Sequence, residues 1–99
     1  MYKSKLKDTY VDGLFKAILE LKDVDECNTF FEDLCTVNEI REMASRLQVA
    51  KMLRQKKTYT DIAEKTGAST ATISRVNRYL HYGSDGYNII LDRLEQNKS

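Results

Sequence analysis

The chain has 99 residues and a net charge of +1, a size that predicts a single domain over residues 1–99 with a small hydrophobic core. Proline is absent and glycine occurs four times, which favours an all-α fold over a sheet. No apolar run approaches the roughly 18 residues that a membrane span needs, and the basic N-terminus is not followed by the apolar core of a signal peptide. We therefore expect a cytoplasmic protein with no membrane partner.

The charges are distributed unevenly along the chain. Residues 1–40 hold five Lys/Arg and nine Asp/Glu, residues 41–82 hold nine and three, and residues 83–99 hold two and three. The middle segment therefore carries +6, between segments of −4 and −1. Such a concentration of positive charge is typical of a surface that faces phosphates, although a solvated basic face without a partner is the alternative.

The first predicted helix runs from Lys5 to about Leu21. Its apolar band is too wide for one face of a small monomer, so part of it must be covered by something else. The band consists of Leu6, Tyr10, Val11, Leu14, Phe15, Ala17, Ile18, Leu19 and Leu21.

Two capping patterns mark the starts of the next two helices. Asp23 with Glu26, and Thr36 with Glu39, have the spacing of a capping box. The helix that follows Asp23 carries an apolar stripe. The stripe consists of Cys27, Phe30, Phe31 and Leu34. The third helix, from about Val37 to Gln55, is apolar almost all round near its centre and is expected to be buried.

The two cysteines do not indicate a metal site. Cys27 and Cys35 are eight apart, and no other cysteine or histidine stands at ligand spacing. Cys27 belongs to the apolar stripe and is predicted to be a buried small hydrophobe. We expect both thiols to be reduced and expect no metal or other cofactor.

The segment from Tyr59 to Arg78 has the apolar spacing of a helix-turn-helix. Ile62 and Thr66 lie four apart in its first helix, and Ile73 and Val76 lie three apart in its second. Between the two helices, a sharp turn is predicted at Gly67, a position that often needs positive φ. Ala63 is small where the helices cross, and Ala68 is expected to tuck inward.

The second of these helices presents a polar and basic outer face. Ser69 is a good N-cap for it, and no acidic residue lies between Ser69 and Arg78. Hydroxyls and cations at this end suit a DNA major groove. The outward residues are Thr70, Thr72, Ser74, Arg75 and Arg78. The alternative is a helix pair that only packs.

The chain ends in one more predicted helix. His81 to Gly86 is expected to be a loop, in which Ser84 or Asp85 caps the helix. Its inward residues are predicted to be Tyr87, Ile90, Leu91 and Leu94. Wide apolar bands on the first and last helices predict a homodimer, whose two reading helices would lie about 34 Å apart. A monomer with a few exposed apolar residues is the alternative.

The order of six helices, with Gly67, Ala68 and the run from Ala71 to Arg75, resembles the Trp repressor family, and most closely its YerC/YecD-type members. The similarity extends from about residue 10 to residue 95. It implies an intertwined, all-helical homodimer that binds palindromic operator DNA and represses transcription. Matching the family's reading surface onto this chain gives Tyr59, Thr60, Ser69, Thr70, Ala71, Thr72 and Ser74 as DNA contacts. Phosphate contacts are expected from Lys56, Lys57, Lys65 and Arg78.

The resemblance does not extend to the ligand site of the family, where two arginines and a glycine hold tryptophan. Arg75 matches one arginine, but the other position aligns with Ser45, beside Arg46, and the glycine aligns with Val76. Two further pocket positions, a threonine and a serine, align with Cys35 and Tyr79. We therefore do not expect tryptophan to be the effector: either none exists or it is a different one. Arg75 stays a candidate for ligand, phosphate or partner-subunit contact.

Enzymatic activity is not expected, because the chain has no phosphate loop, nucleophile elbow or paired-carboxylate pattern, and we assign no catalytic residue. His81 is the only histidine and is expected to cap a helix end or contact phosphate. The alternative function is a dimeric helical interaction module that uses the basic surface to bind an acidic protein.

Overall fold

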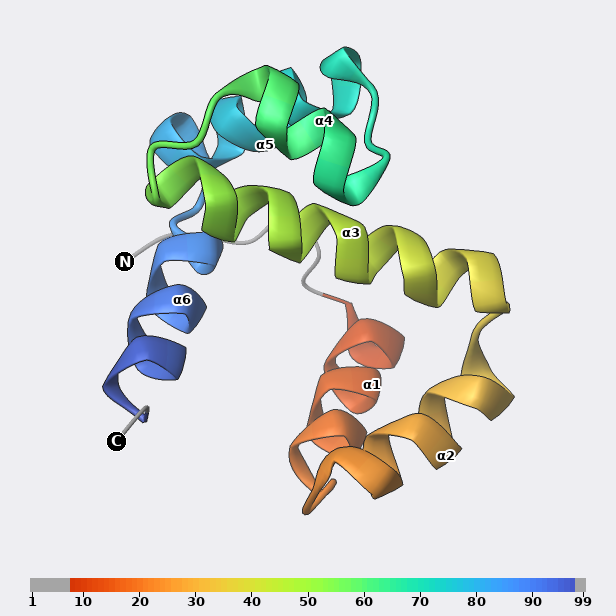
Figure 1. The fold of residues 1–99 in the computed structure, drawn as a ribbon. Coiled ribbons are helices and arrows are strands. Elements are labelled where there is room, and N and C mark those ends of the chain that lie inside the picture. The colour runs from red at the N-terminus through yellow and green to blue at the C-terminus, as the bar shows by residue number, and fades with distance from the viewer. Residues whose placement is uncertain (1–7, 98–99) are drawn as a thin grey trace. The chain divides into compact units, whose positions relative to one another are not determined.

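The computed structural model describes residues 8–97, and within that range the chain forms six α-helices and no strand (Figure 1). This confirms the predicted all-α fold. The helices are α1 (Thr9–Leu19), α2 (Val24–Leu34), α3 (Val37–Arg54), α4 (Tyr59–Thr66), α5 (Thr70–Tyr82) and α6 (Gly86–Gln96). The first predicted helix, from Lys5 to about Leu21, is shorter in the structure, because Asp8 has an extended backbone and caps α1, which ends at Leu19. Leu6 lies outside the described residues. The chain divides into two compact units, with the boundary inside α3 after Ile40.

In the N-terminal unit, side-chain caps fix the starts of the helices. Asp23 Oδ1 accepts from the Glu26 N–H at 2.9 Å, and Glu26 Oε1 accepts from the Lys22 N–H at 2.9 Å. Thr36 and Glu39 form a reciprocal capping box: Glu39 Oε1 accepts from the Thr36 N–H at 2.8 Å, and Thr36 Oγ1 accepts from the Glu39 N–H at 3.1 Å. Both predicted helix starts are confirmed.

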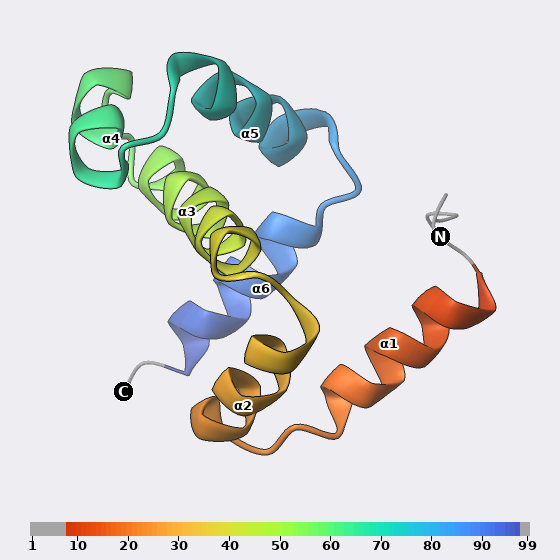
Figure 2. The same cartoon turned by 90° about the vertical axis from the view of Figure 1, so that its right-hand side faces the viewer.

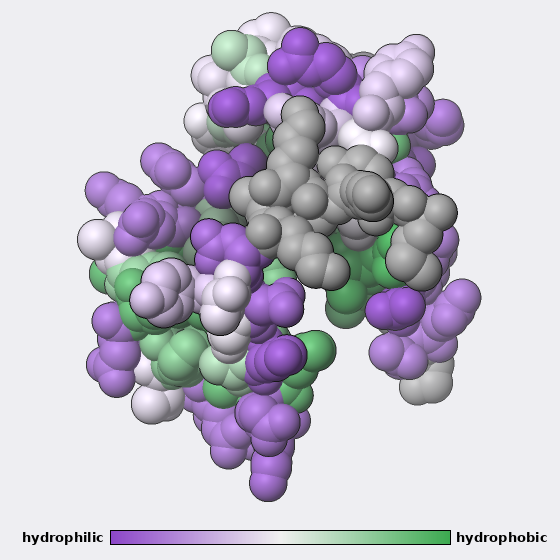
Figure 3. Space-filling view, turned by 180° about the vertical axis from the view of Figure 1, so that it is seen from behind, coloured by the Kyte–Doolittle hydropathy of each residue, from purple (hydrophilic) through white to green (hydrophobic). Residues whose placement is uncertain are grey.

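Apolar side chains of the N-terminal unit remain at its surface. None of residues 8–40 is fully buried, and green patches cover the surface formed by α1 and α2 (Figure 3). The exposed large apolar residues here are Tyr10, Phe15, Leu19, Val24, Leu34 and Val37. Cys27, predicted to be buried, is a free thiol that is only partly covered, because this unit has no closed core of its own.

The core lies in the C-terminal unit. There α4 contacts α5 and α5 contacts α6, with α4 and α5 on one side of the C-terminal part of α3 and α6 on the other (Figures 1 and 2). The buried cluster comprises Val49, Ala50, Met52, Ile62, Ile73, Val76 and Leu91. Packing of these side chains fixes the positions of α4 and α5.

Two predictions of burial are wrong in part. In α3, burial is confined to the C-terminal part, while Met43 and Leu47 remain 40% and 37% exposed, because the core contributed by α4 to α6 meets only that part of the helix. In α6, Leu91 is buried and Tyr87 packs against the core, but Ile90 and Leu94 are 42% and 51% exposed. These two face outward from the chain.

The connection to α6 is shorter than predicted. Helix α5 continues through His81 to Tyr82, so the loop is only residues 83–85. Asp85 precedes α6 but does not cap it, because its backbone is left-handed (φ +71°) instead of extended. Its carboxylate accepts from Asn88 Nδ2 at 2.9 Å instead.

Candidate nucleic-acid interface

Helix α4 is positioned by a cap before it and a turn after it. Thr58 Oγ1 accepts from the Asp61 N–H at 3.1 Å, and Ile62 is fully buried. At the other end, Thr66 Oγ1 donates to the Ile62 carbonyl at 2.7 Å and accepts from the Ala68 N–H at 3.1 Å. These bonds fix the direction in which the chain leaves α4.

The turn between the helices matches the sequence prediction. Gly67 has φ +74°, in the left-handed region that favours glycine. Ala68 follows it and, like Ala63, packs against the core. The sharp turn leads from α4 into α5, which contacts α4, as a helix-turn-helix requires (Figure 2).

Helix α5 begins at the predicted cap. Ser69 Oγ accepts from the Thr72 N–H at 3.1 Å and donates to Thr72 Oγ1 at 3.1 Å. Ile73 and Val76 are each 1% exposed and anchor the opposite face of the helix. The outer face therefore presents its side chains to solvent. Thr70, Ala71, Ser74, Arg75 and Arg78 are exposed, and Thr72 is half-buried.

Exposed cations lie within the helix-turn-helix and just before it. Lys57 precedes α4, Lys65 lies in its last turn, and the Arg78 guanidinium lies over the Tyr79 ring at 5.8 Å. Within residues 8–97, the one ion pair is Arg54 with Asp92, so these cations are not neutralised by a carboxylate. The surface therefore combines hydroxyls, which can bond to base edges, with cations, which attract phosphates.

The sequence-predicted contacts lie at the starts of the two helices and further along the motif. Tyr59 and Thr60 occupy the first turn of α4, and Ser69 to Thr72 occupy the start of α5. Ser74, Arg75 and Arg78 follow along α5, Lys57 precedes α4, and Lys65 lies in the last turn of α4. Sequence reasoning missed Thr58, although the spacing of Thr58 and Asp61 resembles that of a capping pair. It also missed the left-handed backbone of Lys56, at φ +64°, for which the sequence carries no pattern.

On α5, the residues that the resemblance aligns with the tryptophan site differ in burial. Val76, which takes the place of a glycine, is part of the packed core. Arg75 and Tyr79 are exposed on the same helix. None of the three lines either of the two cavities of the C-terminal unit described next.

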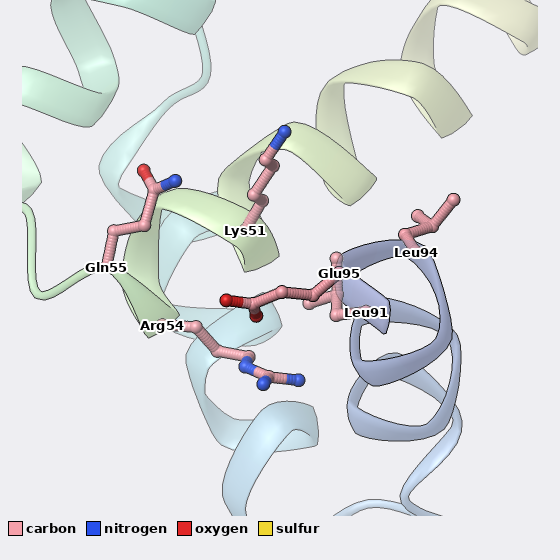
Figure 4. Close-up of a pocket in the computed structure, with 6 residues that line it drawn as sticks. All are labelled: Lys51, Arg54, Gln55, Leu91, Leu94 and Glu95. Carbon is pink, nitrogen blue, oxygen red and sulfur yellow. The ribbon is translucent and has the colours of Figure 1, made fainter. Parts of the chain in front are cut away.

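The smaller cavity, of about 220 Å³, lies between α3 and α6. Figure 4 shows the Glu95 side chain extending toward α3, where Arg54 and Lys51 lie, while Leu94 points away. The larger, about 570 Å³, lies at the C-terminal ends of α3 and α5 and contains no acidic residue in its wall. The two cavities thus differ in the charge that they present.

No described helix is long and apolar enough to cross a membrane. In the same residues, no group of three His, Cys, Asp or Glu side chains is placed to hold a metal ion.

The chain matches the sequence model of the Trp repressor protein family over residues 9–95. It belongs to the Trp repressor family. Membership confirms the resemblance noted in the sequence and indicates a DNA-binding regulator. The match extends across both compact units, from α1 to α6.

Individual relatives of the Trp repressor family support the assignment. The uncharacterized protein YerC of Bacillus subtilis (strain 168) is 54% identical over 99 residues, which cover 100% of this chain and 95% of YerC. The crystal structure of a TrpR-like protein from Eubacterium eligens ATCC 27750 matches with a TM-score of 0.90 and 60% identity, over 98% of this chain and 100% of that one. A putative Trp repressor from Staphylococcus aureus matches with a TM-score of 0.89 and 55% identity, over 96% and 95% of the two chains.

Proposed function

We propose that this protein is a transcriptional repressor that binds a palindromic operator as a homodimer, through the α4–α5 helix-turn-helix. The observation that carries the proposal is the start of α5. Its exposed hydroxyls stand on a helix whose opposite face is held in the core by Ile73 and Val76. A reading helix needs this combination, because base contacts require side chains held at a fixed depth in the major groove.

Within this proposal, hydroxyls read bases and cations position the protein. Thr70, Thr72 and Ser74 reach base edges directly or through water. Tyr59 and Thr60, at the start of α4, contact the adjoining backbone. The phosphate contacts come from Lys57, Lys65, Arg75 and Arg78, all of them exposed.

The exposed apolar surface supports the homodimer. Leu19 is 81% exposed and Val24 is 76% exposed, and α6 adds Leu94 at 51%. Leaving so many large apolar side chains in water is unfavourable, so a second copy is the natural cover. Two-fold symmetry would place two reading helices about one helical turn of DNA apart.

Tryptophan is not the effector in this proposal. Val76 is buried in the core and its branched side chain stands where the family has glycine, so the space for an indole ring is not available beside Arg75. The regulator acts either without an effector or with a different one.

Fluorescence anisotropy with labelled duplex DNA, at two salt concentrations, tests DNA binding directly. We expect affinity to fall steeply as salt rises, since each phosphate contact contributes about −0.9 to the slope of log K against log salt. Binding that is insensitive to salt, or an acidic protein partner that duplex DNA cannot displace, would contradict the proposal and favour the interaction-module alternative.

A further inference from the structure

The larger cavity lies where three helix ends meet. Its wall is formed by the C-terminus of α3 and the residues after it, the C-terminal half of α5 and the first turn of α6. Apart from two leucines, every residue in the wall is polar or cationic: Arg54, Lys56, Lys57, Asn77, His81 and Asn88. The absence of an acidic lining residue distinguishes it from the smaller cavity, where Glu95 would repel an anion.

The backbone at Lys56 shows that a lysine is used where glycine would be more stable. Helix α3 ends in a Schellman motif, in which the Lys57 N–H donates to the Met52 carbonyl at 3.1 Å and the Lys56 N–H donates to the Leu53 carbonyl at 3.0 Å. The motif forces Lys56 to φ +64°, a left-handed conformation that strains any residue with a Cβ. Such strain commonly marks a functional position.

Helix-end stabilisation does not explain this lysine. A cation in the last turn of a helix interacts favourably with the helix dipole, and α3 already has Lys51 and Arg54 there. Lys56 lies beyond that turn, at the position where glycine is strongly enriched.

The wall of the cavity is held by internal bonds that leave the lysines unopposed. Arg54 Nη2 pairs with Asp92 Oδ1 at 2.7 Å, which neutralises that arginine and ties α3 to α6. Asn88 Nδ2 donates to the Leu80 carbonyl at 3.0 Å. Neither Lys56 nor Lys57 has a carboxylate partner among residues 8–97, so two positive charges remain at the cavity.

We propose that this cavity binds a small phosphate-bearing anion. Two ammonium groups match the charge of a phosphate monoester, which is about −1.5 to −2 at neutral pH, and the carboxamide of Asn77 adds a hydrogen-bonding group. A volume of about 570 Å³ accommodates a small metabolite.

Occupancy would have a regulatory consequence, which rests on the proposed function. Lys57 belongs both to the cavity and to the cations next to α4 that are assigned to DNA phosphates. An anion bound to Lys57 removes that charge from the DNA-binding surface. The anion is therefore an effector that weakens operator binding.

The test is a titration of the full-length protein with inorganic pyrophosphate, followed by backbone amide NMR at constant ionic strength. We expect saturable shifts centred on Lys56, Lys57, His81 and Asn88. The Lys56→Gly variant should bind pyrophosphate at least tenfold more weakly and yet unfold at a higher temperature, because it relieves the left-handed strain. The Lys16→Gln variant, which removes one exposed charge from α1, should bind like the parent protein.

Shifts that do not saturate, or equal affinity in Lys56→Gly, would overturn the anion site. The same titration with duplex DNA separates the sources of phosphate. If DNA alone perturbs Lys56 and pyrophosphate does not, the cavity is a DNA-backbone contact and the small-anion proposal is wrong. If pyrophosphate saturates the site but no duplex binds, the site stands and the proposed function fails.

Discussion

Ser69 and Thr72 are joined twice at the start of α5: Ser69 Oγ accepts from the Thr72 N–H and donates to Thr72 Oγ1, both at 3.1 Å. The N-cap of the helix therefore also fixes one of the proposed reading hydroxyls. With the Ser69 proton already donated to Thr72 Oγ1, the Thr72 hydroxyl is left to donate outward. Acceptors on base edges, such as purine N7, are the groups that it would meet.

Replacing Thr72 should relax base preference at one operator position. We expect Thr72→Ala to lose roughly 1–3 kcal/mol of discrimination there, with little change at other positions. Thr72→Ser keeps the hydroxyl and its bond from Ser69, so it should keep the preference. Competition binding with single-base operator variants measures both, and equal discrimination by the Ala and Ser variants would show that Thr72 does not read a base.

Arg78→Ala should weaken binding to all DNA sequences alike. Removing one phosphate contact should make the slope of log K against log salt shallower by about 0.9. Lys16→Gln removes an exposed charge from α1, outside the proposed surface, and serves as the control. An Arg78 variant whose loss of affinity depends on the base sequence would instead indicate base contact.

Gly67→Ala should destabilise the protein by about 1–2 kcal/mol, because φ is +74° there and alanine is strained in that region. No atom lies within 4 Å of the added Cβ, so the backbone conformation is the whole cause. Gly13 has equally open surroundings but lies within α1, so Gly13→Ala should stabilise its helix by up to about 1 kcal/mol. Urea unfolding monitored by circular dichroism should show the two effects with opposite signs.

The Thr36–Glu39 capping box should make stability depend on pH in the acid range. Hydrogen bonds from the Thr36 backbone N–H, and with its side chain, lower the pKa of Glu39 below its ordinary value of 4.5. A carboxyl group whose pKa is lowered by folding stabilises the protein at pH values above its pKa in the unfolded chain. This stabilisation is lost as the pH falls through its pKa in the folded protein. The unfolding temperature, measured from pH 7 down to pH 3, should therefore fall less steeply in Glu39→Gln than in the parent protein.

Leu19→Lys should shift the proposed homodimer toward the monomer. Leu19 is 81% exposed in the single chain, so a charge there is harmless to a monomer but costly inside an apolar interface. Sedimentation equilibrium should give twice 11.5 kDa for the parent protein and a lower mass for the variant. A parent protein that sediments as 11.5 kDa at all concentrations would exclude the dimer.

The helix-turn-helix could be predicted because its determinants are local. Gly67, the Ser69 cap and the spacing of Ile73 and Val76 each act over one or two helical turns, and the structure has all of them as predicted. The exposure of Met43 and Leu94 could not be predicted in this way, because it depends on which other helices cover them. Asp85 failed as a cap for a related reason: the loop before α6 is shorter than predicted and sets its backbone to φ +71°.

Membership of the Trp repressor family explains some features of the chain and not others. Membership explains the order of helices and the outward face of α5. Val76 and Lys56 have features that family membership does not explain. Val76 is buried in the core next to Arg75 in the chain. Lys56 has a left-handed backbone at the end of α3.

Selection of bound duplexes from a random-sequence pool, using the purified protein, tests whether α5 reads a DNA sequence. We expect enrichment of an inverted repeat whose half-sites are centred about 34 Å apart, one turn of the double helix. The Thr72→Ala protein should select a repeat degenerate at one symmetric pair of positions. A pool that shows no enriched sequence after selection would contradict the assignment of α5 as a sequence-reading helix.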